Sequence, residues 1–414
     1  MQVRAHMDVE VVAVEQDERV AVMLELVAPV ADEGAGRPPA TVQVVLDRSG
    51  SMDGERLAAA RHALARLVDR LHPSDRLGVV AFDDEVQVVL PAGEVRDRHA
   101  ARRAVSAIAP GGCTNLSSGL LRGLQEAARV AGEAGATVLV LSDGHANAGE
   151  TDPDRLASVA AGARARGITT STVGIGLGYD EGLLSALARG GQGDHVFAEH
   201  ADAAVAAVAG EVDGLLATTI QAASLIVRPA APVEGVAVHN DVPAQPVPGG
   251  IMLELGDLWS GEERKVVLTF DVPAKTALGL AEVAVLELRF VALPGFREQT
   301  VTVPVHVNVV PGDQAAGRIP DPKVRDELVY QEVQAAKRRA SEALRRGDAG
   351  AAADAYAAAA AQVDGLAAPA PELAEEALIL RDLRDRARDG GGAWAAKYGL
   401  MDAARKSRKR GRRV

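Results

Sequence analysis

The sequence predicts a doubly wound α/β domain that is inserted in an all-β sandwich and followed by a helical region. From Val42 onward, apolar strands alternate with amphipathic helices, a pattern typical of a mostly parallel sheet covered on both faces. After about residue 218 the alternation stops, and strands follow one another between Pro and Gly turns. From Pro322 the periodicity is helical. A chain of 414 residues is also too long for one hydrophobic core, so several structural units are expected.

The boundaries of these parts follow from changes in composition. Residues 1–36 hold two β-branched-rich segments around a polar turn, which predicts a β-hairpin. Because an isolated hairpin is marginal in water, we expect it to complete the sandwich of residues 218–312. The α/β domain, residues 37–217, is then an insertion between the first and the later sandwich strands. We expect residues 313–404 to be helical and residues 405–414 to be a basic, disordered tail.

Within the α/β domain, each element is expected from its hydrophobic pattern. The expected strands are 41–47, 76–82, 85–91, 137–143, 168–176 and 195–198. The segment 85–91 is amphipathic, so we expect an antiparallel strand at the edge of the sheet. The expected helices are 54–71, 115–131, 153–166, 180–189 and 201–216.

In the helical region, an antiparallel pair of helices is predicted on either side of Gly347-Asp348. A third helix is expected at 371–388, and a short segment follows the break at 390–392. The pair resembles a single tetratricopeptide hairpin, but a solenoid needs at least three such repeats.

Net charge and cysteine content limit the classes of function. A net charge of −12 argues against nucleic acid as the primary partner, because phosphate binding needs concentrated positive charge. Positive charge is concentrated in the last ten residues; they suit an acidic protein, an anionic membrane or nucleic acid, or are simply a solvated end. The single cysteine, Cys113, cannot form an intramolecular disulfide, and charges interrupt the N-terminus where a signal peptide is apolar. We therefore expect a cytoplasmic protein without a transmembrane segment.

The clearest chemical pattern lies where strands of the α/β domain end. Asp47 and Asp143 each close an apolar strand, and ligands of doubly wound sheets bind beyond the carboxyl ends of the strands. Ser49 and Ser51 follow the first strand, and Thr114 lies in a Gly-rich loop that opens a helix. Hydroxyl and carboxylate oxygens suit a hard cation such as Mg²⁺. The alternative for each residue alone is a helix cap or a turn.

Three segments carry a family resemblance. The sequences "DRSGSM" at 47–52, "GGCTN" at 111–115 and "LSDG" at 141–144 resemble the signature segments of bacterial-type von Willebrand factor type A domains, which have a Rossmann-like fold. In that family these segments form a metal-ion-dependent adhesion site. The resemblance covers about residues 40–217. Cys113 departs from it, since many relatives have a smaller residue before the threonine.

The resemblance implies a complete metal site and a function. It implies Ser49, Ser51 and Thr114 as hydroxyl ligands, with Asp47 and Asp143 as mainly water-mediated carboxylates. The expected function is non-catalytic: a partner protein's Asp or Glu docks on Mg²⁺, with Mn²⁺ or Ca²⁺ as alternative ions. One alternative is an adaptor for a separate AAA+ ATPase of the MoxR or metal-chelatase type. Another is a scaffold that binds through its helical C-terminus.

Other candidate sites have simpler explanations. The glycine run at 174–182 lacks a Walker lysine and the G-x-G-x-x-G spacing of nucleotide loops. Ser51 lacks the G-x-S-x-G context of a hydrolase nucleophile, so we expect no enzyme activity. His145 is expected to be an exposed loop residue, and residues 83–85 a polar turn. The remaining histidines considered show no metal-ligand spacing: His195, His200, His239 and His306.

Overall fold

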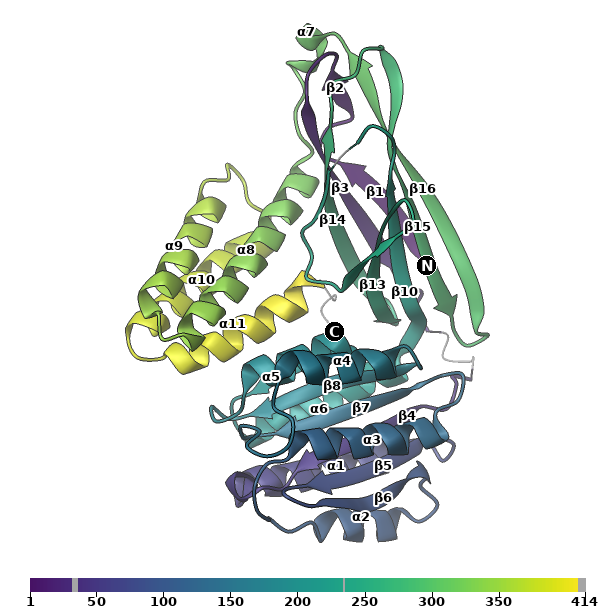
Figure 1. Ribbon diagram of the computed structural model, residues 1–414, viewed down its shortest axis with the longest axis vertical. Coiled ribbons are helices and arrows are strands. Elements are labelled where there is room, and N and C mark those ends of the chain that lie inside the picture. Colours follow the sequence, from purple (N-terminus) through teal and green to yellow (C-terminus); the bar gives the residue numbers. More distant parts are fainter. Residues whose placement is uncertain (32–35, 234, 409–414) are drawn as a thin grey trace. The chain divides into compact units, whose positions relative to one another are not determined.

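The computed structural model describes residues 1–31, 36–233 and 235–408, and the chain divides into two compact units (Figure 1). Unit 1 consists of Met1–Ala31 and Thr219–Val414, and unit 2 of Asp32–Thr218. Unit 2 therefore interrupts unit 1 in the sequence. No helix in the three described ranges has both the length and the apolar character that crossing a membrane requires.

Unit 2 is built on a six-stranded sheet with the order β6-β5-β4-β7-β8-β9. Neighbouring strands are parallel except for the pair of β5 and β6, so β6 is the antiparallel edge strand that the sequence predicts. The strands are β4 (Thr41–Asp47), β5 (Arg76–Phe82), β6 (Val86–Glu94), β7 (Ala136–Ser142), β8 (Ile168–Ile175) and β9 (Gln192–Ala198). Every residue of β4 is buried, as expected for a central strand that is covered on both faces.

Helices cover both faces of this sheet. One buried cluster joins alternate residues of β4, Val42, Val44 and Leu46, to α1, α2 and α6. Helices α3, α4 and α5 lie on the other face. The helices are α1 (Glu55–Arg70), α2 (Arg98–Ser106), α3 (Leu116–Val130), α4 (Pro153–Arg164), α5 (Glu181–Gly190) and α6 (Ala201–Leu216), with a short 3₁₀ turn, η1 (Gly50–Met52). The hydrophobic pattern of residues 98–106 does not predict α2.

Two glycines set the distance between α3 and the sheet. A Cβ on Gly123 would lie 2.2 Å from Val45 Cγ2, and a Cβ on Gly119 would lie 2.5 Å from Phe82 Cδ1. No real Cβ comes so close, so these glycines let α3 pack directly on β4 and β5. The N-terminus of α3 is thereby held beside the carboxyl end of β4.

Unit 1 contains two further sheets that enclose a common core. Their strand orders are β1-β3-β14-β11 and β12-β13-β10-β15-β16-β2. The strands are β1 (Gln2–Met7), β2 (Val11–Ala13), β3 (Glu18–Val27), β10 (Thr218–Pro229), β11 (Gly235–Val238), β12 (Ala244–Val247), β13 (Gly250–Trp259), β14 (Glu263–Val272), β15 (Gly279–Ala292) and β16 (Arg297–Val310). Buried residues of both sheets, such as Leu24, Leu225 and Phe270, form one cluster.

The N-terminal segment differs from a simple hairpin. β1 pairs antiparallel with β3 in one sheet, whereas β2 pairs parallel with β16 in the other. The apolar run at 2–14 is therefore two strands rather than one. Asp8 makes the break possible, because its carboxylate accepts hydrogen bonds from Val9 N and Ala21 N, each 2.8 Å long.

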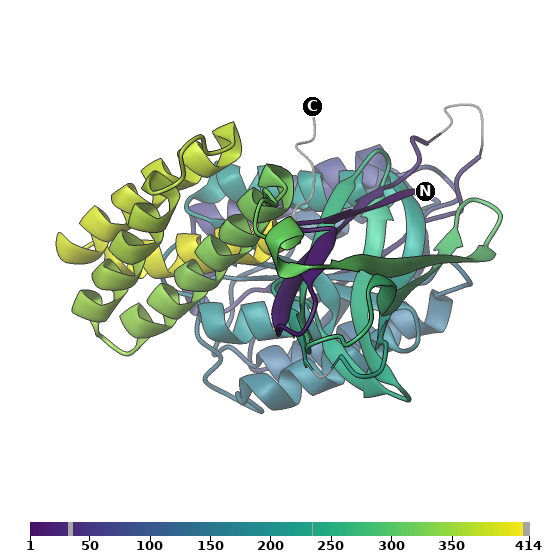
Figure 2. The same cartoon turned by 90° about the horizontal axis from the view of Figure 1, so that it is seen from above.

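Four helices of unit 1 close into a bundle (Figures 1 and 2). α9 packs against α8 and α10, and α11 packs against the same two helices. The closed arrangement differs from an open tetratricopeptide hairpin, because α11 covers the face of α8 that such a hairpin leaves exposed. The bundle helices are α8 (Pro322–Arg345), α9 (Ala349–Asp364), α10 (Pro371–Arg388) and α11 (Gly392–Ser407), and the short helix α7 (Gly312–Ala315) precedes them.

The end of α11 corrects the expected boundary of the basic tail. Residues 405–407 are helical rather than disordered, because Ser407 is buried against the sandwich. Its carbonyl oxygen accepts a hydrogen bond from Asn240 Nδ2 (2.6 Å), and its Oγ accepts one from Asp241 N (2.7 Å). The remaining basic residues predicted for the tail, 409–414, lie outside the described residues.

A buried ionic cluster joins three helices of the bundle. Lys337 of α8 is fully buried, and its Nζ forms ion pairs with Glu376 of α10 and with Asp402 of α11, the latter at 2.5 Å. Lys406 Nζ lies 2.6 Å from Glu376 and 3.0 Å from Asp402. Burial opposes ionisation of Asp402, but the two lysines outweigh it and lower the pKa of this carboxyl. The cluster therefore places two cations against two carboxylates.

Candidate metal site

The five predicted residues lie at one edge of the unit 2 sheet, where the parallel strands β4 and β7 end. Asp47 is the last residue of β4, and Asp143 follows Ser142, the last residue of β7. Ser49 and Ser51 belong to the segment between β4 and α1, and Thr114 lies two residues before α3. Because β4 and β7 are adjacent and parallel, their carboxyl ends bring these loops together.

Asp47 is buried and both of its oxygens are engaged. Oδ1 accepts a hydrogen bond from Ser49 N (2.8 Å), and Oδ2 accepts one from Ser142 Oγ (2.6 Å). Burial raises the pKa of Asp47, the hydrogen bonds from Ser142 and Ser49 oppose that rise, and the charge of Asp143 adds to it. Asp47 thus fixes the start of the serine loop and links it to the end of β7.

The hydroxyl groups converge on Asp143. Ser49 Oγ and Ser51 Oγ are 3.2 Å apart, and Ser51 Oγ donates a 2.7 Å hydrogen bond to Asp143 Oδ1. A Cβ placed on Gly144 would lie 3.3 Å from both Ser51 Oγ and Thr114 Oγ1, so the Thr114 hydroxyl faces the same place. Ser49, Thr114 and Asp143 are buried, whereas Ser51 is exposed. The structure therefore brings all five predicted residues together.

Arg56, in the first turn of α1, is a site residue that the sequence analysis misses. Its Nη1 forms an ion pair with Asp143 Oδ2 and donates a hydrogen bond to Ser51 O (3.2 Å). Its side chain is 41% exposed. One feature of the sequence points to Arg56: the predicted helix begins soon after Ser51. A side chain in the first turn of a helix lies close to the loop that precedes the helix.

Asp83 braces the loop that carries Thr114. Asp83 Oδ2 accepts from Gly112 N (3.2 Å), and Arg48 Nη2 lies 3.2 Å from Asp83 Oδ1. Burial opposes ionisation, but backbone N–H groups and Arg48 outweigh it, so the pKa of Asp83 is lowered. A Cβ on Gly111 would lie 1.6 Å from Asp83 Oδ2, which explains the glycine there. Residues 83–85 are thus a turn with a supporting role.

Thr114 is also held from its other side. Thr114 N donates to Asn147 Oδ1 (2.9 Å), and Asn147 N donates to Thr114 O (3.1 Å). Asn147 lies in the segment after β7, so the threonine loop is tied to the segment that carries Asp143. Cys113, directly before Thr114, is exposed and has a free thiol.

The glycine run after β8 also abuts the site. Gly176 has φ +71°, and its Cβ would lie 3.3 Å from Arg56 Nη2. A Cβ on Gly178 would lie 3.0 Å from Asp143 O. These glycines therefore allow the loop to approach the site, which accounts for them without a phosphate ligand.

Two histidines of unit 2 have different environments. His145 is 68% exposed, with Nδ1 3.8 Å from Asp180 Oδ2, as expected for a loop residue. His195 is buried: its Nδ1 lies 2.9 Å from Thr172 Oγ1 and its Nε2 lies 3.3 Å from Tyr179 OH. Because Thr172 Oγ1 already donates its proton to Leu184 O, the Nδ1 of His195 is the donor and Nε2 accepts from Tyr179. His195 is therefore a structural residue of the core.

The donor set at the edge of the sheet fits a hard divalent cation. Three hydroxyl oxygens and two carboxylates lie together, and the Arg56 guanidinium shows that a positive group is accommodated beside Asp143. In the part of the chain that the structure describes, no three or more His, Cys, Asp or Glu side chains are grouped to hold a metal ion. A cation at this edge would therefore depend on Ser49, Ser51 and Thr114.

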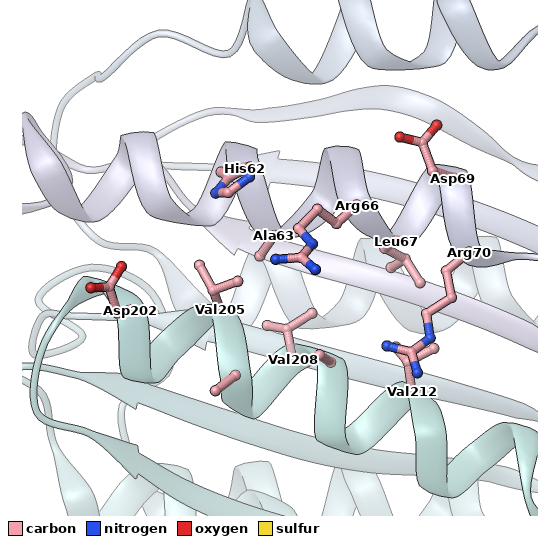
Figure 3. Close-up of a pocket in the computed structure, with 12 residues that line it drawn as sticks. His62, Ala63, Arg66, Leu67, Asp69, Arg70, Asp202, Val205, Val208 and Val212 are labelled. Atoms are coloured by element: carbon pink, nitrogen blue, oxygen red, sulfur yellow. The ribbon is translucent and has the colours of Figure 1, made fainter.

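A separate pocket of about 630 Å³ lies between α1 and α6 (Figure 3). Its floor is apolar and includes Leu67, Val208 and Val212, and the side chains of Arg66 and Arg70 extend from α1 toward the valines. None of the five candidate metal-site residues lines it. Arg70, which lines the pocket, forms an ion pair with Asp213 of α6.

Comparison with protein families supports the domain assignment. Residues 42–209 match the model of the von Willebrand factor type A domain. An uncharacterized protein of Synechocystis sp. is 32% identical over 254 residues, which are 58% of this chain and 59% of that protein. The human inter-alpha-trypsin inhibitor heavy chain H3 is 31% identical over 135 residues, 30% of this chain and 15% of its own length. This chain thus spans less than two thirds of either relative.

Two solved structures resemble nearly the whole chain. The structure of the von Willebrand factor type A protein from Catenulispora acidiphila matches with a TM-score of 0.72 at 18% sequence identity. The match covers 99% of this chain and 97% of the Catenulispora chain. The structure of the ArnB paralog VWA2 from Sulfolobus acidocaldarius matches with a TM-score of 0.65 at 14% sequence identity. The match covers 98% of this chain and 99% of the Sulfolobus chain. At such low identity the likeness concerns the fold alone.

Proposed function

We propose that the von Willebrand factor type A domain of this chain is a non-catalytic interaction module that binds an Asp or Glu side chain of a partner protein through Mg²⁺, or through Mn²⁺ or Ca²⁺. Ser49, Ser51 and Thr114 would hold the ion, and Asp47 and Asp143 would orient its water ligands. The observation that carries the proposal is the convergence of these oxygen atoms at the end of β4 and β7. When bound, the ion supplies positive charge and a coordination position for a carboxylate.

The charge of the site supports an acidic partner. Asp47 and Asp143 carry two negative charges when ionised, and Arg56 carries one positive charge beside Asp143. The site residues thus have a formal charge of −1, so a divalent cation would leave the site net positive. A carboxylate from a partner would be attracted to that charge, and a basic side chain would be repelled.

The surroundings of the serines support a binding role rather than catalysis. Ser51 Oγ donates its proton to Asp143, and Ser49 Oγ lies beside Ser51 Oγ. Among the described residues no hydrogen bond joins Ser51 to a histidine that would act as its base. We therefore propose no nucleophile at this site.

The first experiment measures metal binding to the full chain by titration calorimetry. We expect wild-type protein to bind Mg²⁺ or Mn²⁺, and Thr114→Ala to weaken binding by about tenfold or more, because a ligand oxygen is removed. Ser118→Ala, on α3 and outside the oxygen cluster, is the matched control and should bind normally. Equal affinities for wild type and Thr114→Ala would contradict the proposed ligand set.

The second experiment tests the partner. Immobilised protein is used to capture proteins from a native lysate with Mg²⁺ and with EDTA, and Asp47→Ala is the control. We expect capture that requires both Mg²⁺ and Asp47. Recovery of an AAA+ ATPase under these conditions would support the adaptor alternative. Capture that survives EDTA but is lost in Leu378→Glu would support a scaffold that binds through the bundle, since Leu378 of α10 is 65% exposed.

A further inference from the structure

The loop between β8 and α5 places one large apolar side chain at the edge of the candidate metal site. Leu177 lies between Gly176, which abuts Arg56, and Gly178, which abuts the carbonyl oxygen of Asp143. A Cβ on Gly176 would lie 3.3 Å from Arg56 Nη2 and one on Gly178 would lie 3.0 Å from Asp143 O, so the backbone on both sides of Leu177 lies close to site residues. Leu177 itself is 51% exposed.

The loop is held firmly on both sides of Leu177. Gly176 N donates to Ala198 O (2.8 Å), which extends the pairing of β8 with β9. Tyr179 is fully buried, and Asp180 caps α5 by accepting from Leu183 N (3.0 Å). Leu177 therefore cannot turn into the core without breaking these contacts. A single exposed leucine is ordinary, but the backbone on either side of this one lies close to Arg56 and to the carbonyl oxygen of Asp143.

We infer that the partner segment carries a large apolar side chain next to its acidic residue, and that this side chain packs on Leu177. The inference rests on the proposed function, because it describes what surrounds the carboxylate that the site binds. An acid flanked by polar residues would leave Leu177 half-exposed in the complex. An acid flanked by a leucine or phenylalanine would remove apolar surface of both partners from water, which favours binding by about five- to tenfold.

The guanidinium of Arg56 adds a second expectation about the partner. The Arg56 side chain remains 41% exposed and lies against Gly176, directly before Leu177. A lysine or arginine next to the partner's acid would therefore meet the guanidinium and be disfavoured. The recognised feature is thus an Asp or Glu with an apolar and no basic neighbour.

The test uses full-length protein displayed on beads and an array of synthetic peptides as the probe. Each peptide has a Gly-Ser background with a central Asp or Glu, and the flanking position is Leu, Phe, Ser or Lys. Asn replaces the acid in a control set, and every measurement is made with Mg²⁺ and with EDTA. We expect Mg²⁺-dependent binding of acidic peptides, with Leu or Phe preferred over Ser by about five- to tenfold.

Three variants test whether Leu177 causes the preference for an apolar residue next to the acid. Leu177→Ser should abolish the preference for apolar flanks while the dependence on Mg²⁺ and on the acid remains, and Leu177→Met should keep the preference. Leu121→Ser is the matched control, since Leu121 on α3 is 47% exposed, and it should behave as wild type. Thermal unfolding of each variant checks that the fold is retained.

The outcomes separate this inference from the proposed function. Acidic peptides that bind with Mg²⁺ but without an apolar preference, or a preference that survives Leu177→Ser, would overturn the inference alone. Binding that is the same with EDTA or with Asn peptides, or no binding of any acidic peptide, would overturn the proposed function and the inference with it.

Discussion

Arg56 is the residue that most changes the electrostatics of the candidate site. Asp143 uses Oδ1 to accept from Ser51 and Oδ2 to pair with Arg56, so its negative charge is largely compensated within the chain. A divalent cation beside Asp143 would be attracted by the carboxylate and repelled by the positive guanidinium of Arg56. Arg56 is therefore expected to weaken metal binding while it favours acidic partners.

The first prediction concerns this compensation. Arg56→Gln removes a positive charge next to Asp143, so we expect the affinity for Mn²⁺ to rise by roughly tenfold at low ionic strength. Titration calorimetry measures this change. Arg66→Gln alters the charge of the same helix by the same amount, but at the pocket between α1 and α6, and should leave the affinity within about twofold. A fall in affinity for Arg56→Gln would show that Arg56 instead helps to hold the site together.

Residues whose chemistry is visible in their type can be predicted from the sequence, whereas residues whose role depends on tertiary contacts cannot. Asp47, Ser49, Ser51, Thr114 and Asp143 carry oxygen ligands at strand ends, and the structure brings them together. The partners of these five cannot be predicted in the same way. Arg56, Ser142, Asp83 and Asn147 act only because α1, β7 and two loops meet there, and each is an ordinary helix, strand or turn residue in sequence.

At the level of elements, glycines decide how closely loops approach the site. The loop after β8 approaches the site at Gly176, which has φ +71° and whose Cβ would lie 3.3 Å from Arg56 Nη2. This conformation is unfavourable for any residue with a Cβ. The loop position, and with it that of Leu177, thus depends on a backbone that only glycine adopts easily.

The second prediction tests that dependence. Gly176→Ala should destabilise unit 2 by about 1–2 kcal/mol, because the new Cβ forces a strained φ and meets Arg56. Gly162→Ala is the control: Gly162 lies in α4 with open space around its Cα, so alanine should be neutral or stabilising by up to about 1 kcal/mol. Chemical denaturation measures both values, and destabilisation by both substitutions alike would contradict the argument.

The third prediction concerns the buried ionic cluster of the bundle. Lys337→Met leaves Glu376 and Asp402 buried with Lys406 as their remaining cation, so we expect a loss of about 3–5 kcal/mol in the free energy of unfolding. Lys323→Met changes an exposed lysine on the same helix and should cost less than about 0.5 kcal/mol. Similar unfolding curves for the two variants would mean that the cluster adds little to stability.

The elements that sequence reasoning misplaces share a physical cause. The pattern predicts the strands of the unit 2 sheet well, because most of them are apolar runs between turn residues and the edge strand β6 is amphipathic. It misses α2, whose nine residues include three arginines and few large apolar side chains. It also merges β1 with β2, since a break caused by side-chain hydrogen bonds of Asp8 leaves the apolar pattern unchanged.

On the scale of the whole molecule, each unit has a hydrophobic core of its own. The sandwich core of unit 1 and the α/β core of unit 2 are separate clusters of buried residues. Each core is large enough to give a cooperative transition. We therefore expect calorimetry to resolve separate effects of substitutions in the two units.

The fourth prediction concerns Asp75 and tests whether a substitution in unit 2 leaves the stability of unit 1 unchanged. Its carboxylate is buried and accepts hydrogen bonds from Arg37 Nη1 (2.7 Å), Arg37 Nη2 (2.6 Å), Ala40 N (2.8 Å) and His72 N (2.8 Å). Burial opposes ionisation, but these bonds outweigh it and lower the pKa of Asp75. Asp75→Asn should lower the stability of unit 2 by about 2 kcal/mol at pH 7 and leave unit 1 unchanged.

The pH dependence of that difference follows from the direction of the pKa shift. A carboxyl whose pKa is lower in the folded state stabilises the fold above its unfolded pKa, which is about 4. The contribution is lost as the pH falls through the lower, folded pKa. The advantage of wild type over Asp75→Asn should therefore be constant from about pH 5 to 7 and shrink below about pH 4. A difference that grows in acid would contradict this account.

The pairing of the first strands with the last ones has a consequence for protein synthesis. Arg19 of β3 and Asp271 of β14 form an ion pair across 252 residues of sequence, and β2 pairs with β16 near residue 310. All strands of unit 2, by contrast, have left the ribosome by the time Thr218 emerges. The inserted domain can therefore fold during translation, before the strands that pair with the N-terminal strands have been synthesised. In the nascent chain, unit 2 is therefore complete before unit 1.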